Sequence, residues 1–136
     1  MSFLIDTDMV SLSERKRVHP KVAAWMQEHE GESFLSVVTI AELQYGLLNA
    51  PDAHKPSLQE WINGIRSDFA HATEPLTEAV LVRWKQMLLE MRRKNRSMTC
   101  EDSLIAATAL HRGHVVATLN ESHFAPSGVK LVNPMK

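Results

Sequence analysis

The chain has 136 residues, of which 44% are hydrophobic, and this combination suits one domain spanning residues 1–136 with a real apolar core. Its formal net charge is -1 at pH 7, so the chain lacks the overall excess of basic residues that many nucleic-acid-binding domains have. The single cysteine, Cys100, excludes an internal disulfide framework and a zinc site built on paired cysteines.

Apolar stretches are short and interrupted by charge, and the N-terminus lacks a basic region followed by a long apolar run. We therefore expect neither a membrane span nor a signal peptide, and a cytoplasmic location. A dense basic run comprises Arg92, Arg93, Lys94 and Arg96. It could neutralise phosphates, or it could be a solvated helix end.

The first half of the chain predicts alternating strands and helices. Residues 3–5 are apolar and predict a buried strand that runs into a polar turn at residues 6–8. Pro20 is a favourable first helical residue, and Gly31 is a stop signal for the helix between them. Residues 34–38 predict a second buried strand that passes directly into another helix.

The second half continues the same alternation. Apolar residues at helical spacing predict amphipathic helices in residues 57–69 and 77–91. Residues 99–113 predict a helix rich in small residues that ends at a glycine. Residues 114–118 and 129–132 predict the last two strands.

Strands separated by helices predict an α/β/α sandwich, with a central, mostly parallel sheet covered on both faces. In such sheets ligands bind beyond the carboxyl ends of the strands. Asp6, Glu42 and Asn120 each follow a predicted strand, and Asp102 opens the helix that leads into the strand before Asn120. We expect these side chains to converge at one edge of the sheet.

Carboxylates gathered at one place repel each other unless a cation neutralises them, so the cluster is a candidate site for a hard divalent ion such as Mg²⁺ or Mn²⁺. Such an ion can lower the pKa of a bound water that attacks a phosphodiester, and it can stabilise the charge that develops. That is the chemistry of a nuclease.

Each carboxylate also has a purely structural interpretation. Thr39-x-x-Glu42 matches a capping box, in which Glu42 would only bind a backbone amide, and the same pattern recurs at Ser57-x-x-Glu60. Asp102 could merely complement the dipole of the helix that starts after Thr99. Asp6, directly after the first strand, has no such evident capping role.

Four segments resemble the motifs of the PIN domain family, in the order and at the separations typical of that family. These segments are Leu4-Ile5-Asp6-Thr7-Asp8, the stretch from Ser36 to Gly46, the stretch from Asp102 to Ala109, and the ending from Ala117 to Phe124. The last of them is similar to the close of the VapC and FitB-like branch. The resemblance covers nearly the whole chain.

The resemblance implies a PIN fold and an Mg²⁺- or Mn²⁺-dependent endoribonuclease, the toxin of a bacterial toxin–antitoxin pair. It also implies a homodimer and a cognate antitoxin that blocks the site. Carried over by motif, Asp6, Glu42 and Asp102 form the acidic core, and Asp6 and Asp102 are the expected metal ligands. Thr7 and Thr118 become supporting polar residues.

The fourth motif departs from the family pattern, because relatives often have an aspartate where this chain has Asn120 or His123. Asn120 could orient a water through its amide, and His123 could contact phosphate, but neither supplies a full negative charge. We therefore expect weaker metal binding than with four acids. Asp8, two residues after Asp6, could compensate if both face the same side.

Two other functions remain open from the sequence. Asp6-Thr7-Asp8 also resembles the nucleophile motif of haloacid-dehalogenase-like phosphatases, with Asp6 as nucleophile and Asp8 as acid and base. Alternatively, a catalytically weakened PIN fold could serve only as a binding module. Cys100 is expected to be a small buried residue, and Trp25, Trp61 and Trp84 are expected in the core or an interface.

Overall fold

A parallel five-stranded sheet, in the strand order β3-β2-β1-β4-β5, forms the centre of the molecule. The computed structural model describes residues 1–13 and 18–136. The strands are β1 (Phe3–Ile5), β2 (Ser33–Ser36), β3 (Thr73–Glu74), β4 (Val115–Ala117) and β5 (Leu131–Val132). Every pairing between neighbouring strands is parallel, which confirms the sheet type expected from the alternation of strands and helices.

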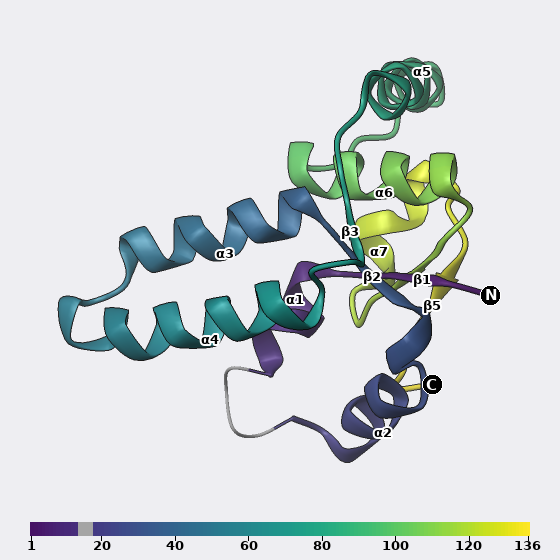
Figure 1. Ribbon diagram of the computed structural model, residues 1–136. Coiled ribbons are helices and arrows are strands. Elements are labelled where there is room, and N and C mark those ends of the chain that lie inside the picture. Colours follow the sequence, from purple (N-terminus) through teal and green to yellow (C-terminus); the bar gives the residue numbers. More distant parts are fainter. Residues whose placement is uncertain (14–17) are drawn as a thin grey trace.

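Helices cover both faces of this sheet, as the sandwich prediction requires (Figure 1). On one side lie α6 and α7, with α5 stacked outside α6; on the other lie α1, α2 and α4, and α3 projects with α4 as a hairpin. The helices are α1 (Thr7–Leu12), α2 (Pro20–Glu28), α3 (Val37–Asn49), α4 (Lys55–Asp68), α5 (Glu78–Arg93), α6 (Cys100–Arg112) and α7 (Glu121–Phe124). Short 3₁₀ turns occupy Glu30–Glu32, Asp52–His54 and Ala125–Ser127.

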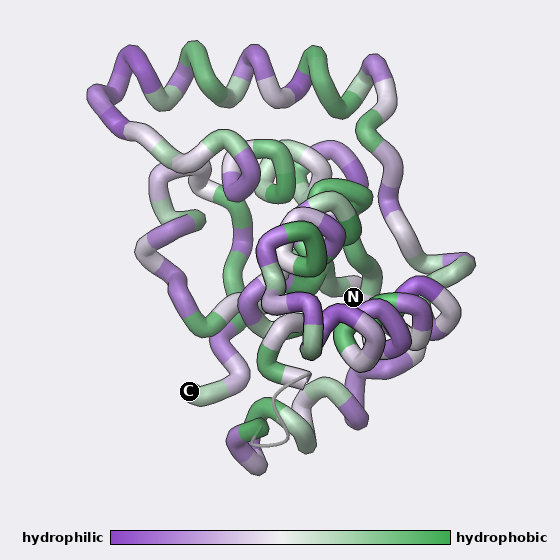
Figure 2. Tube along the Cα trace, turned by 90° about the vertical axis from the view of Figure 1, so that its left-hand side faces the viewer, coloured by the Kyte–Doolittle hydropathy of each residue, from purple (hydrophilic) through white to green (hydrophobic). Residues whose placement is uncertain are grey.

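The core divides into two apolar clusters because successive strand residues face opposite sides of the sheet. In β1, Leu4 joins the cluster beneath α5 and α6, whereas Phe3 and Ile5 join the cluster that contains residues of α1, α2 and α4. On α5, hydrophobic and hydrophilic positions alternate along the helix (Figure 2). Its Trp84 donates a hydrogen bond to Ser103 of α6 at 2.9 Å, which ties the outer helix to the inner one.

Two predicted boundaries near the sheet edge are wrong. Residues 6–8 are not a free turn, because α1 begins at Thr7 directly after Asp6. The second strand ends at Ser36 rather than at residue 38. The Ser36 hydroxyl accepts a hydrogen bond from the backbone amide of Val38 at 3.0 Å and so starts α3 two residues early.

The capping predictions have mixed outcomes. Thr99 is the N-cap of α6, and its hydroxyl accepts from the amide of Asp102 at 3.2 Å. Thr39 caps nothing, because α3 already begins at Val37. Ser57 lies inside α4 and donates to the carbonyl of His54 at 3.1 Å, so neither predicted capping box forms.

Other sequence expectations also change. Cys100 is exposed rather than buried, because it occupies the first turn of α6 on the solvent side. The tryptophans do pack against the core clusters, as expected. The strand β3 and the helix α7 were not anticipated from the sequence.

Candidate active site

The register of the sheet brings residues from both ends of the chain to one edge. Ile5 pairs with Ala117 in the central strands, and the amide of Asp6 donates to the carbonyl of Ala117 at 2.9 Å. The next residue, Thr118, therefore lies beside Asp6 although 112 positions separate them in the chain. Asp6 and Asn120 follow β1 and β4 as the sequence predicted, while α3 and α6 contribute Glu42 and Asp102.

Asp6 is a buried carboxylate, with 3% of its surface exposed. Thr118 donates from Oγ1 to Asp6 Oδ2 at 2.8 Å, and Asp6 makes no side-chain capping bond to α1 although it precedes that helix. Burial raises the pKa of Asp6 from 3.8 to about 6; the Thr118 hydrogen bond opposes this, and repulsion from Asp8 and Asp102 adds to it. Asp6 is thus held by a neutral donor, and among residues 1–13 and 18–136 it forms no ion pair.

Glu42 is held by a chain of hydroxyls instead of the capping bond considered above. Thr7 donates from Oγ1 to Glu42 Oε1 at 2.7 Å, and the hydroxyls of Thr7 and Thr39 are 2.8 Å apart. Because the single hydroxyl proton of Thr7 points to Glu42, Thr39 donates to Thr7. Burial raises the pKa of Glu42; the Thr7 bond opposes the shift, and the charge of Asp102 adds to it. Thr39 is a site residue that sequence reasoning assigned only to capping.

Asp102 enters the site from the first turn of α6. Partial burial raises its pKa, the hydrogen bond with Thr99 and the nearby His123 lower it, and Asp8 raises it. His123 Nδ1 lies 3.9 Å from Asp102 Oδ2, so this histidine from α7 is a neighbour of the acidic cluster. His123, which the sequence suggested as a supporting or phosphate-contacting residue, therefore lies next to Asp102.

Asn120 occupies the place where family relatives often have an acid. Its backbone amide donates to Thr118 Oγ1 at 2.9 Å, and its side-chain Nδ2 donates to Asp8 Oδ2 at 3.1 Å. Asp8 is exposed in the first turn of α1, yet its charge contributes to the raised pKa values of Asp6, Glu42 and Asp102. Asp8 thus belongs to the same electrostatic cluster.

The carboxylates differ from a preformed metal cage. Within residues 1–13 and 18–136, no three His, Cys, Asp or Glu side chains are grouped closely enough to surround one metal ion. However, Mg²⁺ and Mn²⁺ prefer oxygen ligands, and Mg²⁺ usually keeps several waters and takes one or two protein carboxylates. The charge of Asp102 raises the pKa of Asp6, so the two carboxylates are near enough to interact, and their number matches this smaller requirement.

Comparison with known proteins identifies the fold family. The sequence model described as PIN domain matches residues 3–126. The chain belongs to the PIN domain family. This assignment confirms the resemblance seen in the four motifs, and it removes the basis for interpreting Asp6 as the nucleophile of a phosphatase.

Relatives of known name are similar to this PIN domain along nearly its whole length. Toxin FitB of Neisseria gonorrhoeae is 28% identical over 134 residues, which is 96% of each chain. VapC ribonuclease Y4jK of Sinorhizobium fredii is 26% identical over the same share of both chains. Plasmid stability protein StbB of Pseudomonas syringae pv. tomato is 28% identical, again over 96% of each chain.

Solved structures agree with the fold. The crystal structure of FitAcB from Neisseria gonorrhoeae matches with a TM-score of 0.86 and 29% identity over 98% of both chains. A structure of FitAB bound to a DNA fragment matches with a TM-score of 0.87 and 28% identity, over 98% of this chain and 96% of that one. DNA-bound VapBC from Salmonella typhimurium has a TM-score of 0.88 at 21% identity over 98% of each chain, a likeness of fold alone.

In the part of the chain outside residues 14–17, no helix combines the length and the apolar character needed to cross a bilayer.

Proposed function

We propose that this PIN-domain protein is a divalent-metal-dependent endoribonuclease that acts as the toxin of a bacterial toxin–antitoxin pair. The observation that carries the proposal is the cluster of Asp6, Glu42 and Asp102, each with a raised pKa, at the open edge of a parallel sheet. Similarity to proteins named VapC ribonuclease and toxin FitB supports the choice of RNA over other phosphodiesters.

In this proposal Asp6 and Asp102 hold the Mg²⁺ or Mn²⁺ ion. When bound, the cation stabilises negative charge that develops on the phosphate and lowers the pKa of a nearby water. Thr118 fixes the orientation of Asp6 through its 2.8 Å hydrogen bond. Asp8 and Asn120 lie at the rim of the site, where the amide of Asn120 holds the Asp8 carboxylate in place.

Glu42 is the proposed general base. Thr7 occupies Oε1 at 2.7 Å, so Oε2 is the oxygen that accepts a proton from the attacking water. A raised pKa makes the carboxylate a better proton acceptor, and effective general bases have a pKa near the working pH. The relay from Thr39 through Thr7 fixes the orientation of this group.

We also propose that the toxin works as a homodimer in the cytoplasm, where its RNA substrate is found, and is inhibited by a cognate antitoxin. Solved structures of similar chains are described as FitAB and FitAcB assemblies, which supports a partner protein. Large apolar side chains remain exposed on α3 and α5 and suit a protein contact: Tyr45, Leu48, Leu81, Val82 and Leu89.

The test is cleavage of a bulk RNA pool by the purified, antitoxin-free protein with Mg²⁺, with Mn²⁺ and with EDTA. Asp6→Asn and Asp102→Asn should each lower the rate by at least about 100-fold while the fold is retained, because each removes a metal ligand. Glu60→Gln, which changes an exposed carboxylate on α4, should cleave at the wild-type rate.

Full activity in both aspartate variants would contradict the metal site. No cleavage by the wild type under any metal, with an intact circular dichroism spectrum, would instead favour the catalytically weakened binding module. Asn120 would then be the residue to examine, because it replaces a negative charge with an amide.

A further inference from the structure

A groove of 470 Å³ opens directly beside Asp102. It lies between the α5–α6 connection and α7, and its lining residues are Ser97, Met98, Thr99, Asp102, Ser122 and His123. Three of these carry hydroxyl groups, and Met98 supplies an apolar surface. Hydroxyls suit the ribose and phosphate oxygens of a nucleotide, whereas the thioether and the imidazole suit contact with a base.

The chain enters this groove from the basic end of α5, which we define as Arg92, Arg93, Lys94 and Arg96. All four side chains are exposed. Asn95 has a φ of 54°, and the amide of Arg96 donates to the carbonyl of Met91 at 2.8 Å, so the chain turns sharply at the helix end. Ser97, the first lining residue of the groove, follows Arg96 directly, so the basic end leads into the groove along the chain.

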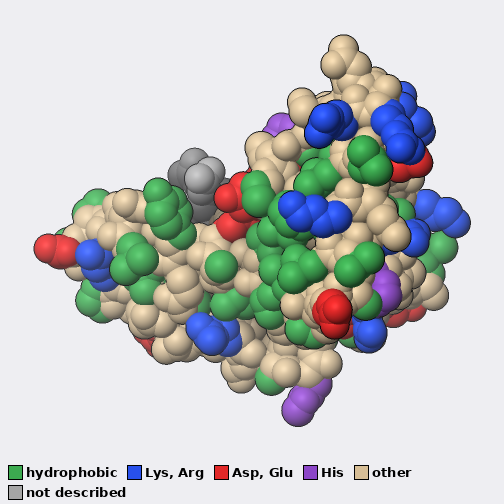
Figure 3. All heavy atoms as spheres, turned by 90° about the horizontal axis from the view of Figure 1, so that it is seen from above, with side chains coloured by type: hydrophobic (Ala, Val, Ile, Leu, Met, Phe, Trp, Pro, Cys, Tyr) green, Lys and Arg blue, Asp and Glu red, His purple; other side chains and the backbone are tan. Residues whose placement is uncertain are grey.

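The arginines of this basic end are free for another partner within the described residues. Lys94 lies 3.9 Å from Glu90 in an exposed ion pair. Elsewhere in the described part of the chain, the one arginine found in an ion pair is Arg112, with Glu74. The view down onto α5 shows Lys and Arg side chains gathered around this helix (Figure 3).

An acidic site needs such a surface if its substrate is a polyanion. Asp6, Asp8, Glu42 and Asp102 repel phosphates, and the whole chain has a net charge of -1, so no general attraction holds RNA. Lys and Arg side chains bind nucleic acid by neutralising phosphates and releasing counterions. Cations placed next to the acidic cluster hold the strand without neutralising the carboxylates themselves.

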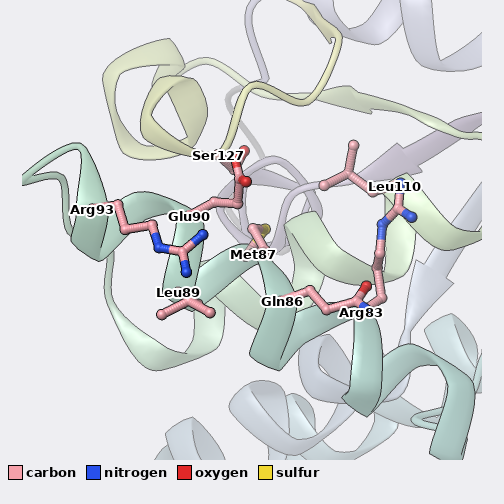
Figure 4. Close-up of a pocket in the computed structure, with 8 residues that line it drawn as sticks. All are labelled: Arg83, Gln86, Met87, Leu89, Glu90, Arg93, Leu110 and Ser127. Atoms are coloured by element: carbon pink, nitrogen blue, oxygen red, sulfur yellow. The ribbon is translucent and has the colours of Figure 1, made fainter.

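A second groove on α5 is less suited to this task. It has a volume of 520 Å³, and Arg83 and Arg93 lie towards its opposite ends (Figure 4). Arg93 also belongs to the basic end, so the two surfaces share this residue. Glu90 also lines it, which places a carboxylate among the cations. None of the acidic site residues lines this groove, so a strand that contacted only this groove would not reach Asp102.

We propose that single-stranded RNA runs from the acidic cluster through the groove beside Asp102 and onto the basic end of α5. This inference rests on the proposed function. There Arg92, Arg93 and Arg96 bind the phosphates that flank the cleaved bond. The groove between Ser97 and His123 contacts the intervening nucleotide. The basic end thus supplies affinity, while the carboxylates perform the chemistry.

The test is a binding measurement that does not depend on cleavage. Fluorescence anisotropy of a short fluorescein-labelled oligouridylate is followed in EDTA across a sodium chloride series, with Asp6→Asn as the background in every sample. Arg92→Gln/Arg93→Gln/Arg96→Gln removes three charges from the basic end. Lys21→Gln/Arg66→Gln/Lys130→Gln removes three exposed charges elsewhere and is the matched control.

Each phosphate contact with single-stranded nucleic acid contributes about 0.7 to the slope of log affinity against log salt. Losing three contacts should therefore lower the slope by about 2 and the affinity at roughly 0.1 M salt by about 100-fold. The control should keep the slope of the background. Equal effects of the two triple variants, or none, would overturn the proposal, because binding would then follow net charge or another surface.

A second pair of variants tests the groove itself. Ser97→Glu places a negative charge on the proposed path and should weaken binding several-fold, whereas Ser67→Glu on α4 should not. Wild-type affinity of Ser97→Glu would exclude the groove from the path. Circular dichroism on all variants identifies any loss of fold.

These experiments distinguish a failure of the proposed RNA path from a failure of the proposed nuclease function. If the basic end governs RNA binding but the wild type cuts no RNA with metal, the path stands and the nuclease proposal fails. If RNA is cut while the triple variant binds like its control, the nuclease stands and this path is wrong. Binding of an acidic protein but not of oligouridylate would also refute it.

Discussion

Asp6→Asn should make the metal-free protein more stable at alkaline pH while abolishing its activity. The Asp6 carboxyl is 3% exposed, and burial is the main reason why its pKa rises from 3.8 to about 6. The folded state therefore holds this proton to a higher pH than the unfolded chain does. Stability is lost as the pH rises from about 4 through about 6, with no further loss above that range.

The size of the effect follows from the two pKa values. One pH unit corresponds to about 1.36 kcal/mol, so a pKa that rises from 3.8 to about 6 costs roughly 3 kcal/mol above the titration range. Asparagine does not titrate, and its amide oxygen still accepts from Thr118. The advantage of Asp6→Asn over the wild type should thus grow by about 2 to 3 kcal/mol between about pH 4 and about pH 8.

Urea unfolding followed by circular dichroism in EDTA measures this difference at acidic, neutral and alkaline pH. Because only the change with pH is compared, any constant cost of burying the asparagine amide cancels. Asp68→Asn, an exposed carboxylate at the end of α4, serves as the matched control. A stability difference between wild type and Asp6→Asn that is the same at all pH values would refute the reasoning.

Three further changes test individual contacts. Thr118→Val removes the hydroxyl that donates to Asp6, and a hydrogen bond to a charged group contributes about 1.5 to 3 kcal/mol. The pKa of Asp6 should therefore rise, and the pH profile of RNA cleavage should move upward by about one to two pH units. Asn120→Asp sets a carboxylate against Asp8, so calorimetry should show tighter Mn²⁺ binding and unfolding in EDTA should show lower stability. Arg112→Ala deprives buried Glu74 of its 2.6 Å partner and should lower the free energy of unfolding by about 1 to 3 kcal/mol in thermal denaturation.

The sequence was sufficient to predict the layered architecture and the edge of the sheet at which the acids meet. The apolar run at Phe3–Ile5 and the segment before Asn120 are buried strands whose pattern is local. Parallel strands separated by helices then place the residues after them at a common edge. Asp6 could be recognised because it follows a strand and has no capping bond to make.

Contacts between distant segments could not be predicted in the same way. The strand β3 has two residues, and it exists because Thr73 and Glu74 pair with β2, which no local periodicity reveals. Glu42 matched a capping box, but Ser36 starts the helix first and Thr7 binds the carboxylate. Deciding between the two roles of Glu42 required the position of α1 relative to α3.

The hydrogen-bond partners of the carboxylates explain how the site keeps its charge. Thr118 holds Asp6, and Thr7 holds Glu42, through neutral hydroxyl donors. An arginine or lysine in either place would stabilise the fold by lowering the pKa of the acid, but it would also remove the negative charge that attracts a metal ion. Hydroxyl donors fix the geometry and leave the repulsion in place, so folding is opposed by the same charge that the proposed chemistry needs. Asn120 extends this pattern, because its amide fixes Asp8 without adding either a positive or a negative charge.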